Sequence, residues 1–184
     1  MFPQIETERL LLRTYKPDEM EKVFELSSDK DVTKHFPPYF RIEKKEVLAS
    51  LPARLERWRT QGFGQFGVFD KADGNLIGYC GFQYLDQTQA VEIYYGFFKK
   101  HWGKGFATEA ARAALRFGFE QAKLPKITAV THPENIESQK VLRKIGFNGG
   151  ELTEFYKMPV VYFEITVEQY EPDDSFYNLS FTEG

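Results

Sequence analysis

Cysteine and histidine are scarce in this sequence. Cys80 is the only cysteine among the 184 residues, so the chain cannot form an intramolecular disulfide. It lies within a predicted strand, and we interpret it as a small buried apolar residue rather than a nucleophile. The three histidines, His35, His101 and His132, lie far apart and form no His-x-x-x-His or Cys-x-x-Cys spacing. The sequence therefore predicts no metal site.

Long apolar runs and an excess of basic residues are also absent. No segment approaches the ~18 consecutive apolar residues of a membrane-spanning helix. The start, MFPQIETERL, lacks the basic and then apolar segments of a secretory signal. We therefore expect a soluble, cytoplasmic protein with no membrane partner. The 24 Lys and Arg against 27 Asp and Glu give a formal net charge of -3, which argues against a nucleic-acid partner.

The most informative segment that is present is KKHWGKGFATEA, at residues 99–110. Gly103 and Gly105 follow a run with strand character, VEIYYGFF, and precede a predicted helix that begins near Phe106. Glycine lets the backbone approach a ligand closely, and the first amides of a helix have no partner within the helix. The segment therefore predicts a site for a phosphate or pyrophosphate.

Two common phosphate-binding loops do not fit this spacing. A Walker A loop needs Gly, four residues and then Gly-Lys-Ser/Thr, whereas Gly103 and Lys104 are followed by Gly105, and position 98 is Phe98. A dinucleotide-binding fingerprint would need glycine at the position of Thr108. Neither a P-loop nor a Rossmann site is predicted.

A second segment, HPENIESQKVLRKIGF at residues 132–147, follows the glycine loop. Together with the pattern Lys100-x-x-Gly103-x-Gly105-x-Ala107, it resembles the GNAT superfamily of acyl-CoA-dependent N-acetyltransferases. The resemblance runs from ETERLLLR, residues 6–13, to about Val167, and it is closest to the branch that includes the ribosomal-protein N-terminal acetyltransferases.

Periodicity predicts an α+β fold, and the resemblance implies a GNAT-like mixed, mostly antiparallel central sheet flanked by helices. We predict one domain over residues 1–170 and a tail over 171–184, which is either disordered or an arm over a partner or the substrate cleft. Two prolines make KHFPPYF, residues 34–40, an irregular loop. Strands are predicted at 9–14, 63–70, 75–85, 91–97, 126–131, 150–156 and 160–167, and helices from 17, over 47–58 with a break at Pro52, and at 106–121 and 134–145.

The resemblance implies acetyl-CoA as co-substrate, held largely by backbone groups. In the family the pantetheine arm pairs with the strand that corresponds to Phe97 and Phe98, and an N–H of this region points at the thioester oxygen. The Thr108 hydroxyl could add a donor to the pyrophosphate site. The amides that would hold the pyrophosphate are those of Gly103, Lys104, Gly105, Phe106, Ala107 and Thr108.

Two residues of the second segment are further candidates for contact with CoA. Asn135 resembles the family's asparagine that contacts the CoA arm, although its type and position also suit a helix cap. Lys140 could reach a CoA phosphate, and the alternative is an ordinary exposed helix lysine.

The catalytic candidates are Glu92 and Ser138. Glu92 is the predicted general base, because the family's corresponding strand commonly carries a carboxylate that faces the acceptor cleft; the alternative is a solvated strand residue. Ser138, one helical turn after Asn135, could protonate the leaving thiolate. Tyr94 and Tyr95 alternate faces, so one of them would line the cleft.

These features predict an N-acetyltransferase that moves an acetyl group from acetyl-CoA to a primary amine by direct attack in a ternary complex. The acceptor would be a protein N-terminus or a small-molecule amine, and the loop HFPPYF would line its cleft. The alternative is a non-catalytic acyl-CoA-binding module. A homodimer could form through strand edges or the tail.

Overall fold

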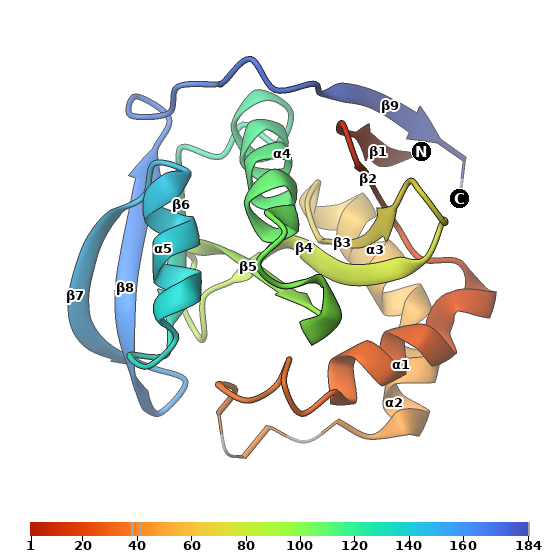
Figure 1. The fold of residues 1–184 in the computed structure, drawn as a ribbon, viewed down its shortest axis with the longest axis horizontal. Coiled ribbons are helices and arrows are strands. Elements are labelled where there is room, and N and C mark those ends of the chain that lie inside the picture. The colour runs from red at the N-terminus through yellow and green to blue at the C-terminus, as the bar shows by residue number, and fades with distance from the viewer. Residues whose placement is uncertain (38, 41, 184) are drawn as a thin grey trace.

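The computed structural model describes residues 1–37, 39–40 and 42–183. The described residues form one nine-stranded sheet, in the order β7-β8-β6-β5-β4-β3-β2-β1-β9, and five α-helices (Figure 1). Every neighbouring pair is antiparallel except β5 and β6, which confirms the predicted α+β fold with a mixed, mostly antiparallel sheet. The strands are β1 Phe2–Glu6, β2 Leu10–Arg13, β3 Gln65–Asp70, β4 Leu76–Tyr84, β5 Val91–Phe97, β6 Lys126–Thr131, β7 Asn148–Phe155, β8 Met158–Thr166 and β9 Asn178–Thr182. The helices are α1 Met20–Ser28, α2 Lys44–Ala49, α3 Leu51–Gln61, α4 Phe106–Glu120 and α5 Ile136–Lys144.

Helices cover both faces of the sheet. Successive side chains of β4 point to opposite faces, so neighbouring residues of this strand contact different helices. Cys80 is fully buried, as predicted, in a large apolar cluster that includes Ala114 of α4. The preceding residue, Tyr79, belongs to a second cluster with Val23 of α1. The helices α4 and α1 therefore pack on opposite faces of the central strands.

The parallel strands β5 and β6 separate along their length. Within the described chain they pair at a single position, where Glu92 lies beside Thr128. Beyond it, toward their carboxyl ends, the strands are not hydrogen-bonded to each other. The segment after β5 leads to α4 and the segment after β6 leads to α5, so both helix N-termini lie near this gap. Ligands of α/β sheets bind at such a position.

Both ends of the chain join the sheet, which the sequence did not predict. The strand β1 pairs with β2 on one side and with β9 on the other, with Phe2 opposite Thr182. The expectation of a disordered tail is therefore wrong for residues 178–182, and this part of the tail lies at a sheet edge instead of over the cleft. Phe2 and Ile5 are buried, so β1 is anchored and offers backbone groups to a further strand. Gly184 lies outside the described residues.

Pro52 splits the second helical region as predicted. The helix α2 ends at Ala49, and α3 begins at Leu51 with Pro52 in its first turn, where a missing N–H costs nothing. No helix of the described residues combines the length and the apolar character that crossing a membrane requires.

Candidate active site

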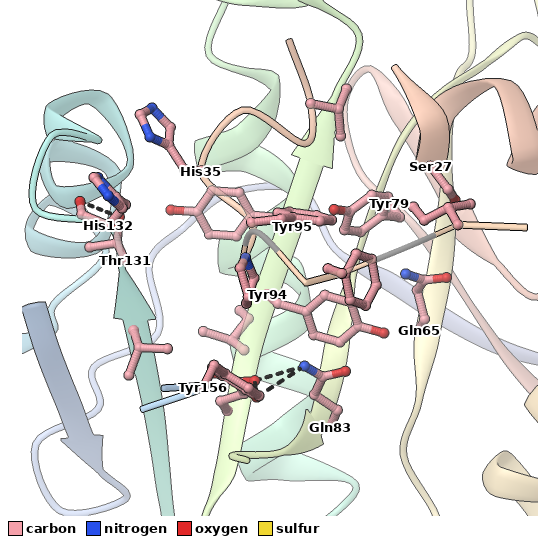
Figure 2. Close-up of a pocket in the computed structure, with 18 of the residues that line it drawn as sticks. Ser27, His35, Gln65, Tyr79, Gln83, Tyr94, Tyr95, Thr131, His132 and Tyr156 are labelled. Atoms are coloured by element: carbon pink, nitrogen blue, oxygen red, sulfur yellow. Dashed lines mark hydrogen bonds between the residues drawn. The ribbon is translucent and has the colours of Figure 1, made fainter. Parts of the chain in front are cut away.

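A cavity of about 700 Å³ lies beside the separated ends of β5 and β6 (Figure 2). Its walls come from β3, β4 and β5, from α2 and α3, from the start of α5 and from the turn between β7 and β8. The loop HFPPYF lines it, as predicted, through His35, Phe36, Pro37, Tyr39 and Phe40, while Pro38 lies outside the described residues. A volume of this size suits a small organic ligand.

Glu92 is a buried carboxylate in this cavity. It is 3% exposed, and its Oε1 accepts a 2.7 Å hydrogen bond from Nε2 of Gln83 and another from the hydroxyl of Tyr156. Burial raises the pKa of Glu92 to about 7 from 4.5, against these two hydrogen bonds, which favour the ionised form. The alternative of a solvated strand residue is therefore wrong, because the turn between β7 and β8 covers this part of β5.

Tyr156 is a residue of the site that the sequence did not indicate. Tyr156 and Lys157 form a two-residue hairpin turn with φ of 53° and 56°. The N–H of Tyr156 donates to Oδ2 of Asp86 at 2.7 Å, and its carbonyl accepts from the hydroxyl of Tyr39 at 2.9 Å. Asparagine and glycine are the usual residues of such a turn, so the pair Tyr-Lys carried no signal for a phenol placed against Glu92.

Tyr94 and Tyr95 leave β5 in opposite directions, and both line the cavity (Figure 2). Tyr94 shares a face with Glu92. The hydroxyl of Tyr95 points toward α5 and lies 3.0 Å from Oγ of Ser138. Two cavity-lining tyrosines are found where one was predicted, because the gap beside β6 exposes the second face of β5.

The glycine loop has the backbone that an anion site requires. Gly103 and Gly105 have φ of 71° and 81°, the left-handed region that other residues avoid. The six amides of residues 103–108 donate to no backbone or side-chain acceptor of the described chain. Arg9, which lies outside the loop, fixes its position. Nη1 of Arg9 donates to the Lys104 carbonyl at 2.9 Å, and Arg9 also forms an ion pair with Glu109.

Fewer backbone N–H and C=O groups at the end of β5 are available to a ligand than the sequence suggested. The N–H of Phe98 donates to the Ile77 carbonyl at 3.1 Å, and the Phe98 carbonyl accepts from the N–H of His101 at 2.9 Å. The Phe97 carbonyl accepts from Nε1 of Trp102 at 2.7 Å. The backbone of Phe98 is thus used within the protein, and the N–H of Phe97 faces the β6 side of the strand by alternation.

Asn135 and Lys140 have protein partners. The side chain of Asn135 caps α5 by accepting a hydrogen bond from the N–H of Ser138 at 3.2 Å. Lys140 is exposed, and its Nζ lies 2.7 Å from Oε1 of Glu137. Asn135 and Ser138 both line the cavity that contains Glu92. The glycine loop does not line it, and Gly105 and Thr108 of the loop border a second cavity of about 500 Å³. The structure thus brings Glu92, Asn135 and Ser138 together and places the loop beyond the end of β5.

No group of three or more His, Cys, Asp or Glu side chains suited to a metal ion occurs among the described residues. The arrangement offers proton transfer by Glu92, Tyr95 and Ser138 next to a backbone site for an anion. A sheet that opens between two parallel strands, with a glycine-rich helix start after one of them, is the arrangement that the resemblance to the GNAT acyltransferases implies.

The comparison with protein families agrees with this class. Residues 9–148 match the family model described as "Acetyltransferase (GNAT) domain". The chain belongs to the GNAT acetyltransferase family, and the predicted resemblance is confirmed.

Individual relatives agree as well. An "Uncharacterized N-acetyltransferase p20" from Bacillus licheniformis is 32% identical over 155 residues, which cover 82% of this chain and 85% of the relative. A "Ribosomal-protein-S5-alanine Acetyltransferase" from Vibrio fischeri shares the fold with a TM-score of 0.74 at 18% identity, covering 92% of this chain and 99% of the other. "Mycobacterium smegmatis RimJ in complex with CoA-disulfide" has a TM-score of 0.71 at 22% identity, with 91% of each chain covered.

Proposed function

We propose that this protein transfers an acetyl group from acetyl-CoA to a primary amine by direct attack in a ternary complex. The observation that carries the proposal is the buried Glu92, whose pKa of about 7 suits a general base at neutral pH. It lies in a cavity large enough for a small acceptor, at the point where β5 and β6 separate.

The described residues fit CoA. The six amides of residues 103–108, which donate to no acceptor of the described chain, offer donors to a pyrophosphate. A Cβ at Gly103 would have no described neighbour within 4 Å, so this part of the loop is open. Lys100 and Lys104 pair with no carboxylate of the described chain and would add positive charge. The solved RimJ structure bound to CoA-disulfide, which shares this fold, also supports CoA as the ligand. Acetyl-CoA would supply the acetyl group as a thioester.

Glu92 would take the proton of the acceptor ammonium, directly or through a water molecule, and so make the amine nucleophilic. Gln83 and Tyr156 hold the carboxylate in one orientation by their hydrogen bonds. The N–H of Phe97, on the β6 side of β5, is the backbone donor that we place near the thioester oxygen.

Tyr95 and Ser138 would return a proton to the leaving thiolate. Burial raises the pKa of Tyr95, so the phenol is protonated at neutral pH. The 3.0 Å contact lets the two hydroxyls act as one donor unit. Because acetyl-CoA is an intracellular metabolite, we also propose a cytoplasmic location.

Release of free thiol from acetyl-CoA tests the proposal. The panel of acceptors is polyamines, aminoglycosides, amino acids and short peptides with N-terminal Ser, Ala or Met. Calorimetry measures acetyl-CoA binding in parallel. Turnover with one class that Glu92→Gln abolishes supports the proposal, whereas binding without turnover on any amine favours a non-catalytic acyl-CoA-binding module.

A further inference from the structure

Arg54 of α3 is a cation in the wall of the cavity. It is half-buried, and neutral groups hold it in place. Its Nε donates to Oγ of Ser50 at 2.9 Å, its Nη1 donates to Oε1 of Gln65, and its Cζ lies 5.6 Å from the centre of the Tyr15 ring. Gln65 is itself fixed by a 3.1 Å hydrogen bond from the Tyr15 hydroxyl. The guanidinium is thus oriented before any ligand arrives.

No carboxylate of the described residues lies within 4.0 Å of Arg54, although Arg9, Arg13 and Arg59 each have one. Glu43 and Glu46 also line the cavity, but they are exposed and screened by solvent. A partly buried cation without a counter-charge is costly unless an anion reaches it. Of the five N–H groups of a guanidinium, at least two remain free here for a carboxylate.

Two phenols stand near this cation. The hydroxyls of Tyr79 and Tyr94 form no hydrogen bond with the described residues, and neither oxygen is sealed from solvent. Figure 2 shows the Tyr94 hydroxyl directed toward Gln65, which is the partner of Arg54. Burial raises the pKa of Tyr94 to about 12, against the nearby charge of Arg54, so the phenol is a donor at neutral pH. Arg54 and Tyr94 therefore offer donors in the same part of the cavity wall.

Glu92 lies on the same strand face as Tyr94, two residues away. The cavity therefore has a carboxylate for an amine at one position and an oriented cation at another. Arg57, which is exposed, adds positive charge at the rim. The histidines of the cavity, His35 and His132, stack on each other with ring centres 5.0 Å apart.

We propose that Arg54 binds a carboxylate of the acceptor, so that the substrate is a primary amine that also bears a carboxylate group. The inference rests on the proposed transfer to an amine and specifies its substrate class. A guanidinium fork recognises a carboxylate in two hydrogen bonds, and a carboxamide of the same shape lacks the charge.

The test compares matched pairs of ligands. The first arm measures calorimetric binding of N-acetyl amino carboxylates and of their carboxamides, for α-, β- and γ-amino skeletons, to the protein with CoA present. These ligands contain no amine, so the result does not depend on amine protonation or on turnover. The second arm measures kcat/KM of the free amines with acetyl-CoA at one pH and compares the wild type with Arg54→Gln, so that differences in amine pKa cancel.

We expect the carboxylate of at least one skeleton to bind roughly tenfold to a hundredfold more tightly than its carboxamide, the range of a charge-assisted hydrogen bond. Arg54→Gln should bring the carboxylate-to-carboxamide ratio near one, in Kd in the first arm and in KM in the second. Arg54→Lys should keep part of the preference. Arg59→Gln is the matched control, because Arg59 lies on the same helix, outside the cavity, and pairs with Glu56 at 3.6 Å.

Equal binding of carboxylates and carboxamides by the wild type would overturn the inference, and so would a ratio that Arg54→Gln leaves intact. If Arg54→Gln does not fold, the ratio in Arg54→Lys decides, and an unchanged ratio there overturns the inference. Carboxylate preference without thiol release would support the anion site and contradict the proposed transfer. Thiol release without any preference would support transfer and contradict the anion site.

Discussion

The glycine loop and the cavity are built in different ways. The loop is six consecutive residues, 103–108, and what it offers is backbone N–H groups. The cavity is made of side chains from distant parts of the chain. Glu92 is held by Gln83, nine residues away, and by Tyr156, 64 residues away, while Gln65 joins Arg54 and Tyr15 across 11 and 50 residues.

This difference separates the two halves of the proposed reaction. A backbone site tolerates changes of side chain as long as φ stays accessible, whereas each side-chain network fails when one member is lost. We therefore expect acetyl-CoA binding to survive mutations in the cavity, and amine binding to survive mutations in the glycine loop. Mutations on each side can test that independence.

The largest effect is expected from Glu92→Gln. The amide keeps the shape but cannot accept the ammonium proton, so kcat/KM for the amine should fall by roughly 10²–10⁴. Calorimetry should give an unchanged Kd for acetyl-CoA. Glu46→Gln, which alters an exposed carboxylate at the rim, is the control and should leave kcat/KM within about twofold. Loss of acetyl-CoA binding in Glu92→Gln would contradict the independence of the two sites.

The pH dependence should report the same carboxylate. Only ionised Glu92 can accept a proton, and burial raises its pKa to about 7, so kcat/KM should rise with pH and level off above that value. At pH 5 the ionised fraction is about one in a hundred, which predicts a rate roughly a hundredfold below the plateau. An acceptor amine with a pKa of about 10 stays protonated between about pH 5 and 8, so its own titration does not enter the profile there. A flat profile over that range with such an amine would exclude Glu92 as the base.

Removal of the Tyr95 hydroxyl should have a smaller effect. Tyr95→Phe takes away one member of the hydroxyl pair with Ser138, and kcat should fall by roughly tenfold to a hundredfold with little change in acetyl-CoA affinity. The double variant Tyr95→Phe/Ser138→Ala should lose little more than the single one, because the two act as a unit. Full additivity in a double-mutant cycle would show that they act separately.

Substitution of Gly103 tests whether the loop binds acetyl-CoA, with Gly74 as a control glycine of the same φ in a distant turn. Gly103 has φ of 71° and Gly74, in the β3–β4 turn, has φ of 72°, and a Cβ at either position meets no atom within 4 Å. Both alanine variants should lose about 1 kcal/mol of unfolding free energy, measured with urea. Only Gly103→Ala should weaken acetyl-CoA binding, by roughly tenfold, because its Cβ enters the open side of the loop. Equal affinities in the two variants would remove the loop from the CoA site.

Local features of the chain were predictable, and long-range pairings were not. The strand–glycine–helix segment lies within about 30 residues, and its function depends on backbone, so spacing alone indicates it. The pairing of Phe2 with Thr182 joins the two ends of the chain, and no local pattern encodes it.

The same limit applies to the site. Glu92 could be singled out as a strand carboxylate, but its burial comes from a turn 64 residues later. Tyr156, Gln83 and Arg54 each have an ordinary local sequence, and they become site residues only through their neighbours in space. Tyr95 gained its contact with Ser138 because β5 and β6 separate, which is a property of the whole sheet.

Asn135 should show the smallest effect, and it belongs to both regions, because it caps α5 and lines the cavity. Asn135→Ala should cost about 1 kcal/mol of unfolding free energy, since Ser138 loses its acceptor. Asn135→Asp keeps an acceptor oxygen and should restore that stability, but it replaces the amide donor with a negative charge. If Asn135 also contacts the CoA arm, this variant should bind acetyl-CoA several-fold more weakly at unchanged stability. Wild-type affinity in Asn135→Asp would show that Asn135 acts only as a helix cap and takes no part in CoA recognition.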